Sequence, residues 1–143
     1  MQDQSEENYF AWMGIFIWID IVWVSYGLMF GAFFEDFFSA FNMSVLYVGA
    51  ADVGSGKFVN ISGKQKNWRH FGIWFLKSYT PNAYFNEKLM RRLTSGTEDF
   101  ERPALFFFGY TLGEKACDDA LFRFFIVFLM IGWISMMWRS YKL

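Results

Sequence analysis

The first long apolar run constrains this chain more than any other feature of its sequence. From residue 9 to residue 34 (YFAWMGIFIWIDIVWVSYGLMFGAFF) the only formal charge is Asp20. As a helix, this run of about 26 residues is ~39 Å long, whereas the hydrocarbon core of a bilayer is ~30 Å thick. The run therefore predicts a tilted transmembrane helix over residues 9–34.

A second apolar run lies near the C-terminus, over residues 120–138 (ALFRFFIVFLMIGWISMMW). Its length of about 19 residues corresponds to ~28 Å of helix, which also fits a bilayer. Arg123 lies close enough to one end for its long side chain to reach the lipid headgroups. Trp138 and Arg139 are residue types that membrane boundaries favour. We expect a second transmembrane helix over 120–138 and a short basic tail over 139–143.

Composition supports the same class of protein. The chain has 143 residues, of which 24% are aromatic, and a soluble domain of this size could not easily bury so many rings. The rival interpretation is a pair of buried helices in a large soluble assembly, but globular helices average only ~11 residues. We therefore expect an all-α integral membrane protein with two transmembrane helices. The polar tail over 1–8 is acidic, unlike the basic start of a secretory signal, so the first run is expected to be a permanent anchor.

The connector over residues 35–119 has a mixed character. We expect short amphipathic segments over 37–53, 67–79 and 103–113 to lie along the membrane surface, with irregular loops between them. Trp68 and Trp74 are the predicted interfacial anchors within it. A break is expected at residues 79–82 because the residue before a proline avoids helical geometry. A short polar helix is expected over 86–94, followed by an exposed turn-rich stretch over 94–103.

The stretch over 37–53 has an alternative as a third membrane span. Against that alternative, Glu35 and Asp36 would form a very short turn for a transmembrane hairpin, and Ser39, Asn42 and Ser44 interrupt the apolar pattern. With two spans both termini share one side of the membrane. We expect that side to be the matrix or cytoplasm, with the connector on the opposite side.

The sequence contains few residues or motifs that are typical of catalysis or metal binding. One cysteine, Cys117, and one histidine, His70, exclude a disulfide framework and an all-Cys/His metal site within one chain. No Ser/His/Asp constellation, dinucleotide fingerprint or HExxH motif is present, so no enzyme activity is expected. A net charge of -1 without a basic stripe makes nucleic acid an unexpected partner. We expect no cofactor, and structural phospholipids as the one class of bound molecule.

Asp20 shares a helical stripe with Gly27 and Gly31, each within about 20° of it, and with Met13. Gly27 and Gly31 form a GxxxG motif, which lets another helix approach closely. In a hairpin of the two spans, Arg123 and Arg139 would each lie ~15 Å from Asp20 along the helix axis. We therefore predict that Asp20 contacts an Arg, Lys, hydroxyl or backbone group of a different subunit, or remains protonated.

Two functions follow from these features. The first is a non-catalytic accessory subunit of a large multi-subunit membrane complex, expected to be a respiratory-chain complex or ATP synthase of the mitochondrial inner membrane. Its partners would be other membrane subunits and lipids. The second is a small homo-oligomeric channel or transporter in which Asp20 lines the pore. A conduction path usually needs several polar groups along its depth, and the first span has one, which favours the subunit.

Overall fold

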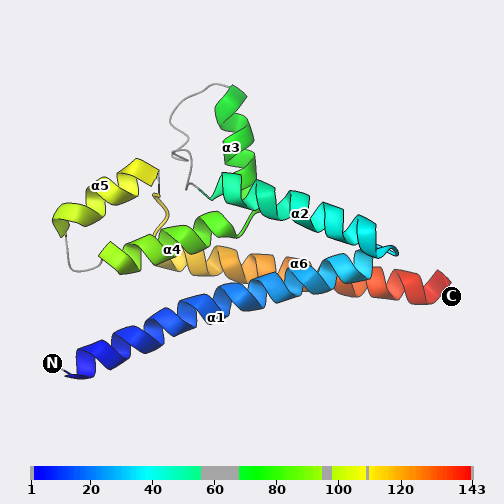
Figure 1. The fold of residues 1–143 in the computed structure, drawn as a ribbon, viewed down its shortest axis with the longest axis horizontal. Helices are drawn as coiled ribbons and strands as arrows, with labels where there is room; N and C mark the ends of the chain where they lie inside the picture. Colours follow the sequence, from blue (N-terminus) through cyan, green and yellow to red (C-terminus); the bar gives the residue numbers. More distant parts are fainter. Residues whose placement is uncertain (1, 56–67, 95–97, 109, 143) are drawn as a thin grey trace.

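The computed structural model describes residues 2–55, 68–94, 98–108 and 110–142, and every regular element within them is a helix (Figure 1). The helices are α1 (Gln2–Phe33), α2 (Phe37–Gly54), α3 (Trp68–Tyr79), α4 (Asn82–Thr94), α5 (Glu98–Phe108) and α6 (Glu114–Lys142). The all-helical prediction is confirmed for these residues. Among them, α1 and α6 are long and apolar enough to cross a membrane.

Both long helices extend beyond their predicted bounds. Helix α1 begins at Gln2, so the expected polar tail is helical from its second residue. Gln and Glu are good helix formers, and acidic groups near a helix N-terminus are favoured by the backbone dipole. Helix α6 begins with Glu114 in its first turn and continues through Arg139 to Lys142 in its last turn. These charges also suit the dipole, so the expected basic tail is part of the helix.

Helices α1 and α6 pack side by side in the same direction. Trp18 stacks on Phe122 with ring centroids 6.4 Å apart, and Tyr26 meets Phe128 edge-on at 5.5 Å. The contacts advance along both helices together, so the pair is parallel, and Figure 1 shows both running from the end that holds the N-terminus to the end that holds the C-terminus. The expected hairpin of two spans, with both termini at one end, is wrong. The chain reverses between the two helices instead.

The contact between α1 and α6 follows coiled-coil spacing. A stripe of buried and half-buried residues on α1 recurs at intervals of four and three positions, and we call it the buried stripe: Ile15, Ile19, Val22, Tyr26 and Met29. It faces the buried residues Leu121, Phe128 and Gly132 of α6. A repeat of about 3.5 residues keeps one face of a helix on its partner, which explains why α1 and α6 remain in contact along their length.

Helix α2 makes the reversal. The chain leaves α1 at Phe33, and the Asp36 carboxylate accepts a hydrogen bond of 2.9 Å from the Ser39 N–H, which caps the start of α2. The helix then returns along α1, where the Tyr47 ring stacks on Tyr26 with centroids 4.7 Å apart. The region 37–53 is thus a separate helix that folds back, not a continuation of α1.

Helix α4 packs beside the first half of α6, whereas α3 packs against α2 and α5 against α4 (Figure 1). The predicted break is confirmed, since α3 ends at Tyr79 and α4 begins at Asn82, four residues before the expected start. The turn-rich interpretation of 94–103 is wrong from Glu98 onward. Glu98 and Asp99 suit a helix N-terminus, and the helix continues past Pro103, although a proline inside a helix removes one backbone hydrogen bond.

Two further sequence expectations concern the connector. Over 103–113, the helix ends at Phe108 and the described residues 110–113 are not helical, so only the first half of this predicted amphipathic segment is a helix. Most of the Gly- and Lys-rich stretch between α2 and α3, residues 56–67, lies outside the described residues.

Candidate functional site

A second stripe on α1 lies opposite the buried stripe. It repeats the same intervals of four and three positions, and every member is exposed; we call it the exposed stripe: Met13, Ile17, Asp20, Val24, Gly27 and Gly31. At about 100° per residue, the two stripes lie on roughly opposite faces of the helix. A Cβ placed on Gly27 or on Gly31 would meet no atom within 4 Å. Helix α1 therefore has one face packed on α6 and a second face with helix-packing spacing that is open.

Asp20 is the charged residue of this exposed stripe. It lines a shallow groove of about 280 Å³ between α1 and α6, whose other lining residues are Ile17, Ile21, Val24, Ser25, Leu28, Phe125 and Leu129. The Ser25 hydroxyl donates to the Val22 carbonyl at 2.7 Å, so its proton is already used within α1. The groove therefore presents one carboxylate in an otherwise apolar lining.

The parallel packing sets the depth of Asp20. Gly14 lines a cleft with Asp118 and Asp119 of α6, which marks the level of the last acidic residues before Asp20 at that end. Asp20 lies about six residues further along α1, or ~9 Å, and Glu35 lies about 15 residues beyond Asp20, or ~22 Å. Asp20 is thus in the third of the apolar section nearest the N-terminal end, within reach of a long basic side chain from that end.

The position of Arg123 also differs from the hairpin expectation. Because Trp18 packs on Phe122, Arg123 lies near the level of Asp20 and not ~15 Å away along the axis. Its charge nevertheless acts on Tyr84 of α4, where burial raises the pKa of the Tyr84 hydroxyl and Arg123 opposes that shift. Within the described residues, no ion pair joins Asp20 to Arg123. The carboxylate therefore has no cationic partner in this part of the chain.

The predicted membrane anchors lie on α3 and α6. Arg123 and Trp138 are exposed, and the Lys142 ammonium lies 5.6 Å from the Trp138 ring centroid. Arg139 is half-buried in the last turn of α6. Trp68 and Trp74 belong to α3, but their side chains lie outside the described part of the structure. Trp138 and Arg139 thus lie near the C-terminal end of α6, whereas Arg123 lies in its first half, near the level of Asp20.

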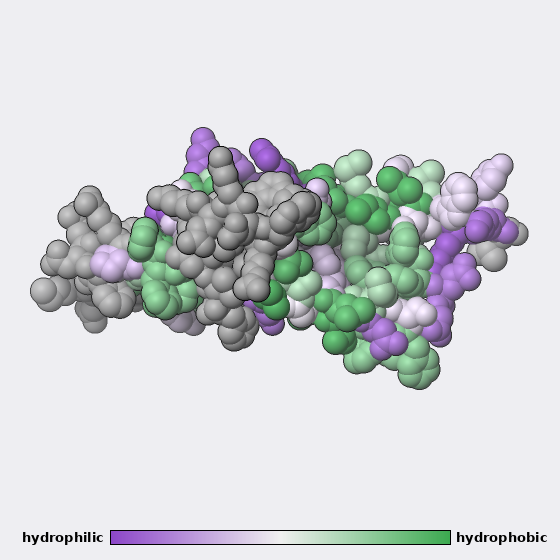
Figure 2. Space-filling model, turned by 90° about the horizontal axis from the view of Figure 1, so that it is seen from above, coloured by the Kyte–Doolittle hydropathy of each residue, from purple (hydrophilic) through white to green (hydrophobic). Residues whose placement is uncertain are grey.

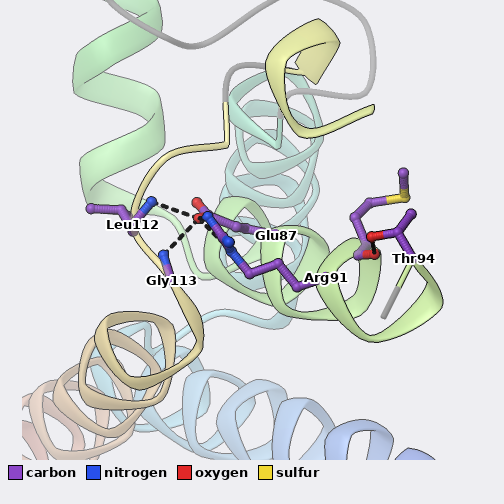
Figure 3. A network of polar contacts seen from close by, with 6 residues as sticks. Glu87, Arg91, Thr94, Leu112 and Gly113 are labelled. Atoms are coloured by element: carbon purple, nitrogen blue, oxygen red, sulfur yellow. Dashed lines mark hydrogen bonds and ion pairs between the residues drawn. The ribbon is translucent and has the colours of Figure 1, made fainter. Parts of the chain in front are cut away.

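A buried carboxylate holds the start of α6 (Figure 3). The Glu87 side chain of α4 is 1% exposed, and its Oε1 accepts backbone hydrogen bonds from Leu112 at 2.6 Å and from Gly113 at 2.9 Å. The Arg91 guanidinium donates to the same oxygen at 2.9 Å. Gly113 has a φ of +93°, a conformation that favours glycine. Glu87 therefore fixes the chain direction at the entrance to α6.

Further polar links lie at the same end of the bundle. Tyr110 donates to the Ser55 carbonyl at 2.8 Å, and Asn82 donates to the Asp52 carboxylate at 3.0 Å. Both bonds hold the end of α2 against the connector. Burial raises the pKa of the Tyr110 hydroxyl. These contacts form a polar layer at the end of the bundle where α2 finishes and α6 begins.

The burial of Glu87 and its role at the start of α6 were not predicted from the sequence. The only signal was Arg91 four residues later, a spacing that favours an ion pair on one helix face. That spacing is usual on solvent-exposed helices and does not show that the carboxylate is buried.

No metal-binding cluster of three or more His, Cys, Asp or Glu side chains occurs in the described ranges. Cys117, the one cysteine, is buried in α6. No protein-family model matches the chain, and neither the curated proteins nor the solved structures contain a match. The functional interpretation therefore rests on the surfaces that this chain offers to other molecules.

Proposed function

We propose that this chain is an integral membrane protein that acts as a non-catalytic accessory subunit of a large multi-subunit membrane complex. Insertion is supported by the low burial of its long helices. In the most apolar 18-residue windows, 28% of α1 and 17% of α6 is buried, whereas a core helix of a soluble protein is mostly buried. Large apolar side chains face outward from both, including Phe16, Leu28, Met130 and Trp133. Such a surface suits lipid or other membrane helices.

The distribution of polarity over the surface supports the same placement. Figure 2 shows hydrophobic residues over the half of this face nearest the C-terminal end, with hydrophilic residues gathered at that end itself. Glu35, Asp36, Arg139 and Lys142 lie there, at the end of α1, the start of α2 and the end of α6. An apolar band closed by charges is the pattern that a bilayer imposes.

The exposed stripe of α1 is the observation that carries the subunit role. Its spacing matches the stripe that already packs on α6, and Gly27 and Gly31 leave space for another helix backbone to approach. A carboxylate facing hydrocarbon is costly unless a donor pairs with it. We propose that the partner is a transmembrane helix of a different subunit, with a Lys or Arg that reaches Asp20 from the N-terminal end.

Two alternatives are less well supported by the same surface. A second copy of this chain docked through the exposed stripe would bring two Asp20 carboxylates together, and like charges repel. A homo-oligomeric channel would need further polar groups along the path. The Ser25 hydroxyl in the groove is bonded to its own helix, so Asp20 stands alone there. The experiment below distinguishes both alternatives from the proposed complex.

For the location, we propose the mitochondrial inner membrane and a respiratory-chain complex or ATP synthase as the host. The support is the composition of the chain: a small, aromatic-rich, anchored protein without catalytic motifs suits an accessory role there. Fractionation of cells that express a tagged chain tests the location separately from the subunit role, because recovery in another membrane would overturn only the location.

The test is purification of a tagged chain from native membranes in a mild detergent, followed by the mass and composition of what accompanies it. We expect a large assembly of different subunits. Asp20→Asn, which keeps hydrogen-bonding capacity, should retain part of the assembly, whereas Asp20→Leu and Gly27→Leu should lose it. Gly49→Leu is the matched control, because Gly49 of α2 also has no atom within 4 Å of an added Cβ but lies off the exposed stripe.

Other outcomes have distinct meanings. A ring of identical chains, with ion flux abolished equally by Asp20→Asn and Asp20→Leu, would establish the channel and overturn the subunit. Equal loss of assembly in Gly27→Leu and Gly49→Leu would also contradict the proposed surface, because it would show that bulk anywhere on the bundle disrupts the complex.

A further inference from the structure

The direction of the helices constrains how the chain is threaded through the membrane. Helices α1 and α6 are parallel, as the pairs Trp18–Phe122 and Tyr26–Phe128 show. If both cross the bilayer, as proposed above, the chain reaches the far face at the end of α1 and must return to the near face before α6 begins. An odd number of crossings must therefore lie between them.

Helix α2 has the position for this return. It begins at Phe37, directly after the end of α1, and Tyr47 then lies against Tyr26 and Phe128, in the middle of the α1–α6 contact. Its last turn reaches the polar layer, where Asp52 accepts the hydrogen bond from Asn82. Figure 1 shows the same course, with α2 running back from the C-terminal end toward the α3–α4 junction.

Helix α2 also has the composition of a membrane segment. Its 18 residues give ~27 Å of helix, close to the ~30 Å hydrocarbon core. No charge lies between Asp36 and Asp52, and most residues of α2 are apolar, although α1 and α6 each contain a longer and more apolar segment. Large apolar side chains point outward from it: Phe37, Phe38, Phe41, Met43, Val45, Leu46, Val48 and Val53.

The structure assigns a position to each of the polar residues in α2 that disfavour a membrane span. Ser39 donates its N–H and hydroxyl to Asp36, so it belongs to the capped turn. The Ser44 carbonyl accepts a hydrogen bond from the Tyr26 hydroxyl at 3.2 Å. Asn42 lies about five residues into the helix, or ~8 Å, which keeps it near the headgroups of the far face. The Asp36 cap also explains how so short a turn reverses the chain.

We infer that α2 is a third membrane-crossing helix, and that the two ends of the chain lie on opposite faces of the membrane. The N-terminal turns of α1 share one face with α4 and the polar layer around Glu87. The Glu35–Asp36 turn and the C-terminus share the other face. The threading rests on the proposed membrane insertion but not on the subunit role or the host complex.

The test is labelling of single added cysteines with a membrane-impermeant maleimide in sealed vesicles of each orientation. The sites are Ser5→Cys, Glu35→Cys, Leu93→Cys and Ser140→Cys. The parent chain is the background control, because its own Cys117 is buried. We expect Ser5→Cys and Leu93→Cys to be labelled from one face, and Glu35→Cys and Ser140→Cys from the other.

Two other patterns would overturn the inference in different ways. Labelling of Ser5→Cys with Ser140→Cys, and of Glu35→Cys with Leu93→Cys from the opposite face, would show two spans and leave the membrane proposal intact. Release of the chain from membranes by alkaline carbonate would overturn the membrane proposal itself. Preserved shielding of Cys117 in every variant confirms that the substitutions have not unfolded the protein.

Discussion

Gly132 of α6 lies directly against the backbone of Met29 of α1: a Cβ added to Gly132 would come within 3.2 Å of the Met29 Cα. This is the close approach that holds the two long helices together near their C-terminal ends. The sequence predicts close contact with a helix of another subunit at Gly27 and Gly31, and both glycines have open space around them. The within-chain contact depends on Gly132 instead, and the difference between these glycines can be tested directly.

Gly132→Leu is expected to destabilise the bundle by about 1–3 kcal/mol, because the added side chain must displace the α1 backbone. The buried Cys117 thiol reports unfolding, so the midpoint of a thermal scan with a thiol-reactive fluorophore in detergent should fall. Gly27→Leu is the matched control and should leave the midpoint unchanged or slightly raised, since Leu is the better helix former by up to ~1 kcal/mol. Equal midpoints for the two variants would contradict the assigned contact.

Removing the Glu87 carboxylate should be more costly. Glu87→Ala leaves the Leu112 and Gly113 N–H groups and the Arg91 guanidinium without their acceptor, and we expect a loss of about 3–5 kcal/mol. Hydrogen exchange at the Leu112 and Gly113 amides, followed by mass spectrometry, should accelerate before the rest of α6 is affected.

The control for Glu87 is the neighbouring ion pair between Lys88 and Asp118, whose carboxylate is 46% exposed. Water screens the half-exposed Asp118 carboxylate, although the Lys88 side chain is only 17% exposed, so Lys88→Ala should cost below about 1 kcal/mol in the same thermal scan. A larger loss for Lys88→Ala than for Glu87→Ala would show that the polar layer depends on the surface pair and not on the buried carboxylate.

The Tyr110 hydroxyl should make stability fall at alkaline pH. Burial raises its pKa above about 10, the value in an unfolded chain. Its contribution is therefore fully present below pH ~10 and is lost as the pH rises, because the unfolded state releases the proton first. Tyr110→Phe should flatten this alkaline decline in the unfolding midpoint, and should cost about 1 kcal/mol at neutral pH through the lost bond to Ser55.

Tyr141→Phe controls for the loss of a tyrosine hydroxyl, because the Tyr141 side chain is 90% exposed. Its profile of stability against pH should match that of the parent chain. A Tyr110→Phe profile that also overlays the parent above pH ~10 would count against the role given to Tyr110.

Cys117 should resist modification while the chain is folded. The thiol is buried near the start of α6, where reagents in solution do not reach it. A small permeant maleimide should therefore leave Cys117 unmodified in native membranes and react fully after denaturation in detergent, as measured by intact mass. Rapid labelling in native membranes would show that the start of α6 is not packed as described.

The sequence by itself determined where the long helices lie and that their surfaces suit an apolar environment. The apolar runs near 9–34 and 120–138, the break at Pro81 and the absence of strands in the described residues follow from local rules: run length, proline geometry and helix propensity. These rules act between near neighbours, so one chain is enough to apply them. They also identified the Asp20–Gly27–Gly31 stripe, because helical periodicity alone shows which residues share a face.

Only the tertiary structure decided how the helices are threaded and which polar group is buried. The direction of α6 relative to α1 depends on whether 37–54 turns back, and that depends on the Asp36 cap and on Tyr47 packing between the two helices. In the sequence, Glu87 is only one of several charged residues on a predicted polar helix. In the folded chain its carboxylate accepts hydrogen bonds from the backbone N–H groups of residues 112 and 113. These groups are distant in the sequence, so only folding brings them together.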